Sequence, residues 1–192
     1  MSTQQGLRPS LNVAIGGPQG VGKSTLIRLL ASHRSDYETI SVGDRFPADF
    51  RSLGDVARAQ IRDQASDYLA TRLKGCTNRV LLVDLHYLDL RETDPHIQRP
   101  DILDLFDLHV LLSLPAVMLA SRRAADPSRM DRSVSIIDAE RDLAAHLKYF
   151  GSESCLSQKC LVLDCLQEPR FVGEELQRHI GAALTERDRR LL

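Results

Sequence analysis

Gly17-Pro18-Gln19-Gly20-Val21-Gly22-Lys23-Ser24-Thr25 is the stretch of the chain that decides its fold. It matches the pattern G-x-x-x-x-G-K-[ST], a glycine-rich loop that ends in a lysine and a hydroxyl residue. An apolar run of strand length, 11–15, leads into the loop, and 24–30 has the composition of a helix leading out of it. This strand-loop-helix context favours a phosphate-binding loop over an ordinary glycine-rich turn.

The positions of this loop predict how it binds a nucleotide. Glycines let the backbone curl so that successive N–H groups point at phosphate oxygens, and the helix N-terminus adds a favourable dipole. Lys23 reaches the β- and γ-phosphates, and the Ser24 hydroxyl contacts magnesium. The predicted cofactors are therefore ATP and Mg²⁺. The loop residues expected to bind them are Gly17, Gln19, Gly20, Val21, Gly22, Lys23, Ser24 and Thr25.

A carboxylate farther along the chain agrees with the loop. Residues 79–84, Arg-Val-Leu-Leu-Val-Asp, form an apolar strand that ends in Asp84. A carboxylate at that edge of a sheet can hold magnesium, directly or through water, beside a phosphate-binding loop. The alternative is that Asp84 only caps a turn. We predict Ser24 and Asp84 as metal ligands, and Lys23 and Asp84 as catalytic residues.

Apolar runs of strand length alternate with longer segments of helical period over the rest of the chain. This alternation predicts an α/β fold with a parallel sheet and helices on both faces. Five strands are expected, at 11–15, 39–42, 80–83, 109–112 and 160–163. With the phosphate-binding loop, the expected architecture is a P-loop three-layer sandwich, whose strand order would be 2-3-1-4-5. We also expect a long helix ending near Gly75, another ending at Gly151, a helix beginning at Pro115 and a closing helix at 171–184.

Length, charge and composition indicate a single domain that binds neither nucleic acid nor a membrane. With 192 residues, of which 43% are hydrophobic, the chain suits one domain, 1–192. The formal net charge of −1 gives no bias toward nucleic acid. No apolar run approaches the roughly 18 residues of a membrane span, and the N-terminus lacks the apolar core of a signal peptide. We therefore expect a cytoplasmic protein whose partner is a small-molecule acceptor, not a nucleic acid or a membrane.

Four further motifs resemble the adenylate-kinase-like nucleoside monophosphate kinases, most closely the archaeal type. Ile-Ser-Val-Gly-Asp at 40–44 resembles the second strand and Gly-Asp turn of that family, and Arg-Ser-Leu at 51–53 resembles its Arg-x-Leu. Val-Asp-Leu-His at 83–86 resembles its Val-Asp-x-His turn, and 122–129 resembles its lid. The likeness covers most of the chain. It implies an acceptor-binding segment at about 43–75 and a lid at about 121–133.

The resemblance also implies roles for individual residues. The acceptor would be bound by Asp44, Arg45, Arg51, His86 and Arg91. Arg122 would bind the nucleotide, Arg129 would act in catalysis by closing over the phosphates, and Gln167 would lie near the adenine. Alternatively, Arg122, Arg123, Arg129 and Arg132 form a solvated helix end. The archaeal kinases associate as trimers, so a homo-oligomer is one option.

The acceptor region departs from the family pattern. Only six residues separate Asp44 from Arg51, a shorter segment than in the archaeal kinases, and the loop at 87–92 also differs. Both differences weaken the case for AMP as acceptor. The number of arginines that could bind a phosphate favours a nucleotide or another phosphorylated acceptor. These arginines are Arg45, Arg51, Arg91 and Arg99.

The same residues are also compatible with two other functions. The shortened acceptor region favours transfer to a hydroxyl group of a metabolite, nucleoside or antibiotic, with Asp44 as the catalytic base. A P-loop ATPase or nucleotide-binding regulator would act on a partner protein, but the sequence shows no strongly apolar segment that indicates a partner surface.

Overall fold

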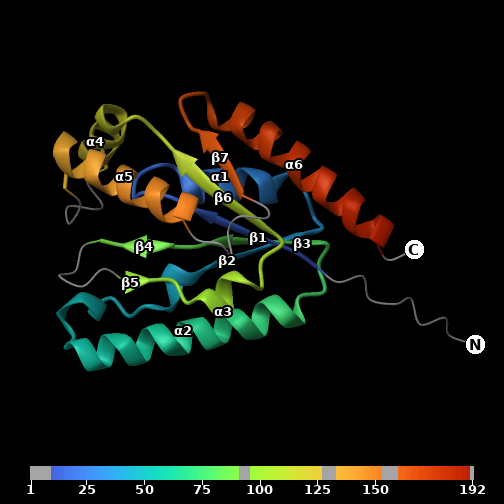
Figure 1. The fold of residues 1–192 in the computed structure, drawn as a ribbon, viewed down its shortest axis with the longest axis horizontal. Helices are drawn as coiled ribbons and strands as arrows, with labels where there is room; N and C mark the ends of the chain where they lie inside the picture. The colour runs from blue at the N-terminus through green and yellow to red at the C-terminus, as the bar shows by residue number, and fades with distance from the viewer. Residues whose placement is uncertain (1–9, 91–95, 127–132, 153–159, 191–192) are drawn as a thin grey trace, which may run out of the picture.

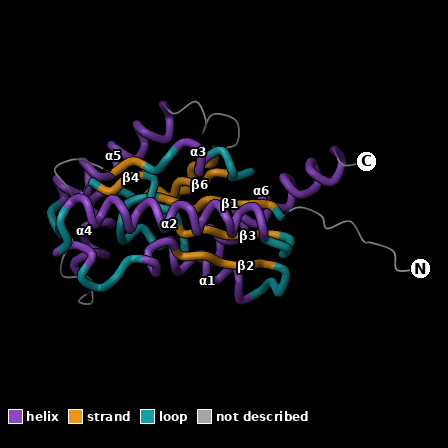
Figure 2. Tube along the Cα trace, turned by 90° about the horizontal axis from the view of Figure 1, so that it is seen from below, coloured by secondary structure: helices purple, strands orange, loops and turns teal. Residues whose placement is uncertain are grey.

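The computed structural model describes residues 10–90, 96–126, 133–152 and 160–190, and a five-stranded parallel sheet forms its centre. The strands are β1 (Leu11–Gly16), β2 (Tyr37–Ser41), β3 (Val80–Asp84), β6 (Leu108–Ser113) and β7 (Cys160–Asp164). Their order is β2-β3-β1-β6-β7, with every neighbouring pair parallel. Figure 2 shows β6, β1, β3 and β2 side by side. Counted as five main strands, this is the order 2-3-1-4-5, so the predicted topology is confirmed.

Helices cover both faces of the sheet (Figure 1). One face carries α1 and α6, the other carries α2 and α3, and α4 packs against α5. Their bounds are α1 (Lys23–Ser32), α2 (Asp55–Gly75), α3 (Pro100–Leu103), α4 (Ala116–Ala124), α5 (Ile136–Ser152) and α6 (Pro169–Arg190). Two short 3₁₀ helices, η1 (Val42–Arg45) and η2 (Phe50–Ser52), follow β2. Within the described ranges, no helix combines the length and apolar character needed to cross a membrane.

The side-chain alternation of the strands builds two cores. In β1, Val13 and Ile15 pack with α1 and α6, whereas Ala14 faces the core that contains α2. Successive side chains of a strand point to opposite faces, so a strand covered on both sides needs apolar residues throughout. Burial on both faces therefore explains why the sequence shows the central strands as unbroken apolar runs.

The main elements lie where they were predicted, with shifted ends. The helix predicted to start at Pro115 has that residue as its N-cap, and α5 ends one residue beyond Gly151. The closing helix runs well past the predicted 171–184. The prediction stopped early because the final turns are polar and show no apolar period. The prediction missed α3 and the antiparallel pair β4 (Leu88–Asp89) and β5 (His96–Ile97), which are too short to show a period.

A histidine, His109, is buried in β6, the strand between β1 and β7. The hydroxyl of Tyr87 lies 3.3 Å from His109 Nδ1, and the ring of Phe106 packs edge-on against the imidazole. Burial lowers the pKa of His109 to about 4. The folded protein therefore holds a neutral imidazole at a pH where the unfolded chain binds a proton.

This burial predicts a specific loss of stability in acid. As the pH falls from 6.5 toward 4, only the unfolded state gains the proton on His109, so stability falls by up to about 3 kcal/mol. Urea unfolding across this range should show that His109→Gln lacks this part of the pH dependence. Equal pH dependence in the wild type and the variant would contradict the assignment.

Candidate functional site

The glycine-rich loop lies between β1 and α1, at the carboxyl edge of the parallel strands. Gly17, Gly20 and Gly22 have positive φ angles of 138°, 85° and 113°. Residues with a Cβ rarely adopt such angles. A Cβ at Gly17 would also lie 2.5 Å from the carbonyl oxygen of Leu112, on β6. The motif therefore forms the tight backbone curl that phosphate binding requires.

Lys23 bonds to the loop itself. Its ammonium donates hydrogen bonds to the carbonyl oxygens of Gly17 and Pro18, at 2.8 and 3.2 Å, and the residue is only 7% exposed. The motif assigns this lysine to phosphates, so these contacts give it a second, structural role. The ammonium thus places a positive charge inside the loop.

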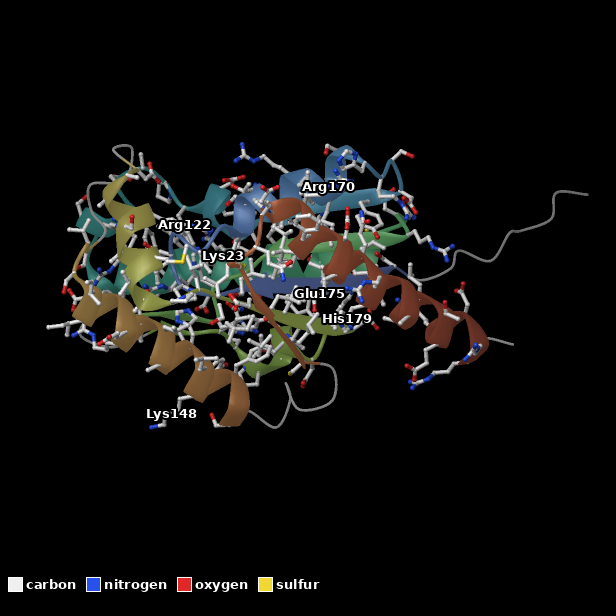
Figure 3. All side chains as sticks on the ribbon, turned by 90° about the horizontal axis from the view of Figure 1, so that it is seen from above. Lys23, Arg122, Lys148, Arg170, Glu175 and His179 are labelled. Atoms are coloured by element: carbon white, nitrogen blue, oxygen red, sulfur yellow. The ribbon has the colours of Figure 1, made fainter. Side chains whose placement is uncertain are left out.

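Arg122 and Arg123 of α4 bond two further carbonyls of the loop. Arg122 donates to Val21 O at 2.9 Å and to Cys165 O at 3.2 Å. Arg123 donates from Nε to Gln19 O at 2.8 Å. Figure 3 shows the labelled Lys23 and Arg122 near one another, between α4 and the start of α1. Three cationic side chains thus bond the backbone of one short loop.

These contacts correct the interpretation of the arginine-rich segment. Arg122 and Arg123 are not a solvated helix end, since the Arg123 side chain is only 5% exposed and Arg122 is partly buried. Both belong to α4, so the first residues of the predicted lid at 121–133 form the end of a helix. Arg129 and Arg132 lie outside the described residues. Arg123 was not predicted as a site residue, because sequence does not show which face of a short helix meets the loop.

A hydroxyl and a carboxylate meet where the magnesium was predicted. Ser24 Oγ, in the first turn of α1, donates to Asp84 Oδ2 at 2.8 Å. Asp84 is the last residue of β3, which pairs with β1, the strand that leads into the loop. Asp84 Oδ1 is buried and has no hydrogen-bond partner in the part of the chain that the structure describes. A buried carboxylate oxygen in that state calls for a cation or water. Hard oxygen donors of this kind suit Mg²⁺, which takes few protein ligands and keeps water and phosphate as the others.

The described residues hold no group of three or more His, Cys, Asp or Glu placed to bind a metal ion. The candidate magnesium site is the Ser24–Asp84 pair, because it offers oxygen donors and because Asp84 Oδ1 has no partner among the described residues.

A cavity of about 260 Å³ opens beside the loop. Its walls include Gly20, Val21, Gly22 and Thr25 of the loop, and Arg122, Cys165, Gln167, Pro169 and Val172 beyond it. Burial raises the pKa of the Cys165 thiol to about 11, so this side chain is a protonated, weakly polar part of the wall. Gln167 and Arg122, both predicted from sequence to contact the nucleotide, line one cavity.

The predicted acceptor residues that the structure describes lie on the segments that follow β2 and β3. Asp44 and Arg45 lie on η1, Arg51 lies on η2, and His86 follows β3. β2 and β3 are paired up to Ser41 and Asp84, so the segments that follow them leave the sheet at the same edge. Arg91 lies outside the described residues.

Two of the predicted phosphate-binding arginines have partners within the protein. The Arg45 guanidinium lies 3.6 Å from the centroid of the Tyr68 ring. Arg99 is surrounded by carboxylates, with Asp101 at 2.7 Å, Asp67 at 3.6 Å and Asp63 at 3.9 Å.

Asp44 differs from these arginines. It is exposed, and no other described residue forms a hydrogen bond or ion pair with its carboxylate.

Comparisons with known proteins bear on the fold. No protein-family model matches the sequence, and no curated protein matches it. Three solved structures cover nearly the whole chain. A gluconokinase from Sinorhizobium meliloti 1021 has a TM-score of 0.58 and 16% sequence identity, and the match covers 96% of each chain. A sugar kinase from Janibacter sp. HTCC2649 has a TM-score of 0.57 and 16% identity, over 92% of this chain and 98% of the kinase. A shikimate kinase from Bacteroides thetaiotaomicron has a TM-score of 0.58 and 14% identity, over 88% of this chain and 97% of the kinase. At these identities the likeness concerns the fold, and the chain has the fold of the P-loop small-molecule kinases.

Proposed function

We propose that this protein is an ATP- and Mg²⁺-dependent kinase that transfers a phosphoryl group to a hydroxyl group of a small molecule. The observation that carries the proposal is the arrangement around the loop. Lys23 is held within the loop, and the Ser24–Asp84 pair leaves one buried carboxylate oxygen without a partner among the described residues. Phosphoryl transfer depends mainly on positioning and charge neutralisation, and these groups supply both.

The nucleotide would lie across the loop with its base in the adjoining cavity. The α1 N-terminus and the loop N–H groups face the phosphates, and Lys23 moves from the carbonyls of Gly17 and Pro18 to the β- and γ-phosphates. The cavity offers the planar Arg122 guanidinium, Pro169 and Gln167 to the adenine. Bound Mg²⁺ would be held by Ser24 and Asp84 and would offset the charge of the phosphates.

Three observations favour a hydroxyl acceptor over a phosphorylated one. Arg45 and Arg99 have partners within the protein, whereas the exposed Asp44 has none among the described residues. The predicted acceptor segment is short, with only six residues between Asp44 and Arg51. The solved kinases of the same fold are named for gluconate, a sugar and shikimate. A phosphorylated acceptor bound near Arg51 is the second candidate, because Arg45 and Arg51 flank the same short segment.

Asp44, Lys23 and Asp84 each have a separate role in the proposed phosphoryl transfer. Asp44 orients the acceptor hydroxyl and takes its proton, and the acceptor oxygen then bonds to the γ-phosphorus while the bond to the β–γ bridging oxygen breaks and ADP leaves. Lys23 stabilises the negative charge that develops on the leaving phosphate oxygens. Asp84 accepts the hydrogen bond of the Ser24 hydroxyl and so orients it, and both groups would hold Mg²⁺, which would supply positive charge to offset that of the phosphates.

Asp44→Asn tests the acceptor chemistry. A general base contributes about 100-fold or more to the rate, so kcat should fall by at least that factor while ATP affinity stays the same. ADP release should be measured with ATP and a panel of sugars, sugar acids, nucleosides and nucleotides. If Asp44→Asn phosphorylates a nucleotide with full activity, the result would contradict the proposed hydroxyl acceptor and support a phosphorylated acceptor. ATP hydrolysis that no acceptor stimulates would favour the ATPase or regulator.

Asp84→Asn tests the metal site, with Asp164→Asn as a matched control. Both aspartates end parallel strands of the sheet, but Asp164 accepts a hydrogen bond from the Leu166 N–H at 2.9 Å and so caps a turn. Losing a carboxylate ligand should raise the Mg²⁺ concentration needed for half-maximal activity by about tenfold or more in Asp84→Asn only. Equal Mg²⁺ dependence in both variants would make Asp84 a structural cap.

A further inference from the structure

Arg123 makes a contact that the loop motif does not contain. Its Nε donates to the Gln19 carbonyl oxygen at 2.8 Å, although Arg123 lies 104 residues farther along the chain. The side chain is 5% exposed, so its charge is buried and must be matched by polar partners. Arg123 is therefore fixed between α4 and the loop.

Asp142 of α5 is the second partner of Arg123. Arg123 Nη2 donates to Asp142 Oδ2 at 2.5 Å, and Nδ1 of the buried His146 lies 3.2 Å from Oδ1 of the same carboxylate. Burial alone would raise the pKa of Asp142, but the contacts with His146 and Arg123 outweigh it and hold the pKa below its usual value. The carboxylate thus stays charged, and it anchors Arg123 to α5.

Gly20, the loop residue that follows Gln19, packs closely against the side chain of Arg123. Gly20 has a φ angle of 85°, and a Cβ at this position would lie 3.1 Å from Arg123 Cγ. Arg123 therefore lies against the loop backbone, and the geometry of the turn at Gly20 depends on both residues.

Planarity of the peptide group gives this contact a consequence for ligand binding. In a trans peptide, the carbonyl of one residue and the N–H of the next point in opposite directions. The bond from Arg123 to Gln19 O therefore directs the Gly20 N–H away from Arg123. Without that bond, the peptide between Gln19 and Gly20 could rotate, because Gly20 accepts a wide range of backbone angles.

We propose that Arg123, anchored by Asp142, is a positioning residue that fixes the Gln19–Gly20 peptide so that the Gly20 N–H faces the phosphates of the nucleotide. The inference rests on the proposed nucleotide binding and extends it to α5, which the loop motif does not include. Its specific consequence is that loss of Arg123 weakens binding of the phosphates and not of the base.

The chain offers a matched control at the opposite end of the sheet. Arg187 of α6 donates to the Ser10 carbonyl oxygen and lies 3.3 Å from Asp107 Oδ2. Like Arg123, it bridges a backbone carbonyl and an aspartate, and it is partly buried, at 23% exposure. It joins α6 to the start of β1, far from the loop. Arg187→Met removes the same kind of contact without touching the nucleotide site.

The experiment compares Arg123→Met and Arg187→Met by calorimetric titration with ATP, inorganic tripolyphosphate and adenosine. A hydrogen bond from a charged donor contributes enough for Arg123→Met to raise the Kd of ATP and tripolyphosphate by about tenfold or more. The Kd of adenosine should stay within about twofold in both variants. Arg187→Met should lower Tm and leave all three Kd values unchanged.

The remaining outcomes separate the inference from the proposed function. Folded Arg123→Met that binds tripolyphosphate like the wild type would overturn the inference, and so would equal weakening of adenosine binding. A wild type that binds neither ATP nor tripolyphosphate would instead overturn the proposed function. If Arg123→Met does not fold, Arg123→Lys and Asp142→Asn decide the matter, since each should raise the Kd of tripolyphosphate by about threefold to tenfold. Unchanged binding by both folded variants would equally overturn the inference.

Discussion

The bonds between three cationic side chains and the carbonyl oxygens of the glycine-rich loop are the interactions on which the rest of the site depends. Lys23 bonds Gly17 and Pro18, Arg123 bonds Gln19, and Arg122 bonds Val21. A loop with several positive φ angles has no regular ladder to hold it, so its conformation must come from such contacts. A backbone fixed in this way can offer its N–H groups to an anion without further ordering.

The fold brings these cations to the loop from separate parts of the chain. The parallel sheet places the loop, Asp84 and the segment after β2 at one carboxyl edge, which is where open α/β sheets bind ligands. The α4 helix follows β6, the neighbour of β1, so its arginines can reach the loop. α5 then fixes α4 through Asp142. The site thus depends on the order of the strands as much as on the motif.

Much of the fold, and the place of the glycine-rich loop and of Asp84 within it, could be predicted from the sequence. The loop residues follow each other without a gap, and strands such as β3 are apolar because they are buried on both faces. Asp84 was predictable because it ends such a strand.

The roles of Arg122 and Arg123 were not predictable in the same way. Neighbouring charged residues look solvated in a sequence, and the backbone carbonyls that Arg122 and Arg123 bond lie more than 40 residues away. The engagement of Arg45 by Tyr68 was hidden for the same reason, since it joins η1 to α2. The β4–β5 pair is too short to show any period.

The most direct test of the account is a crystal structure with Mg²⁺ and a non-hydrolysable ATP analogue. The account predicts the triphosphate on the loop N–H groups, Mg²⁺ between Ser24 and Asp84, Lys23 on the β- and γ-phosphates, and the adenine beside Gln167. Arg122 and Arg123 should keep their bonds to Val21 and Gln19. Phosphates bound away from the loop, or a Lys23 that stays on the carbonyls of Gly17 and Pro18 with no phosphate contact, would contradict it.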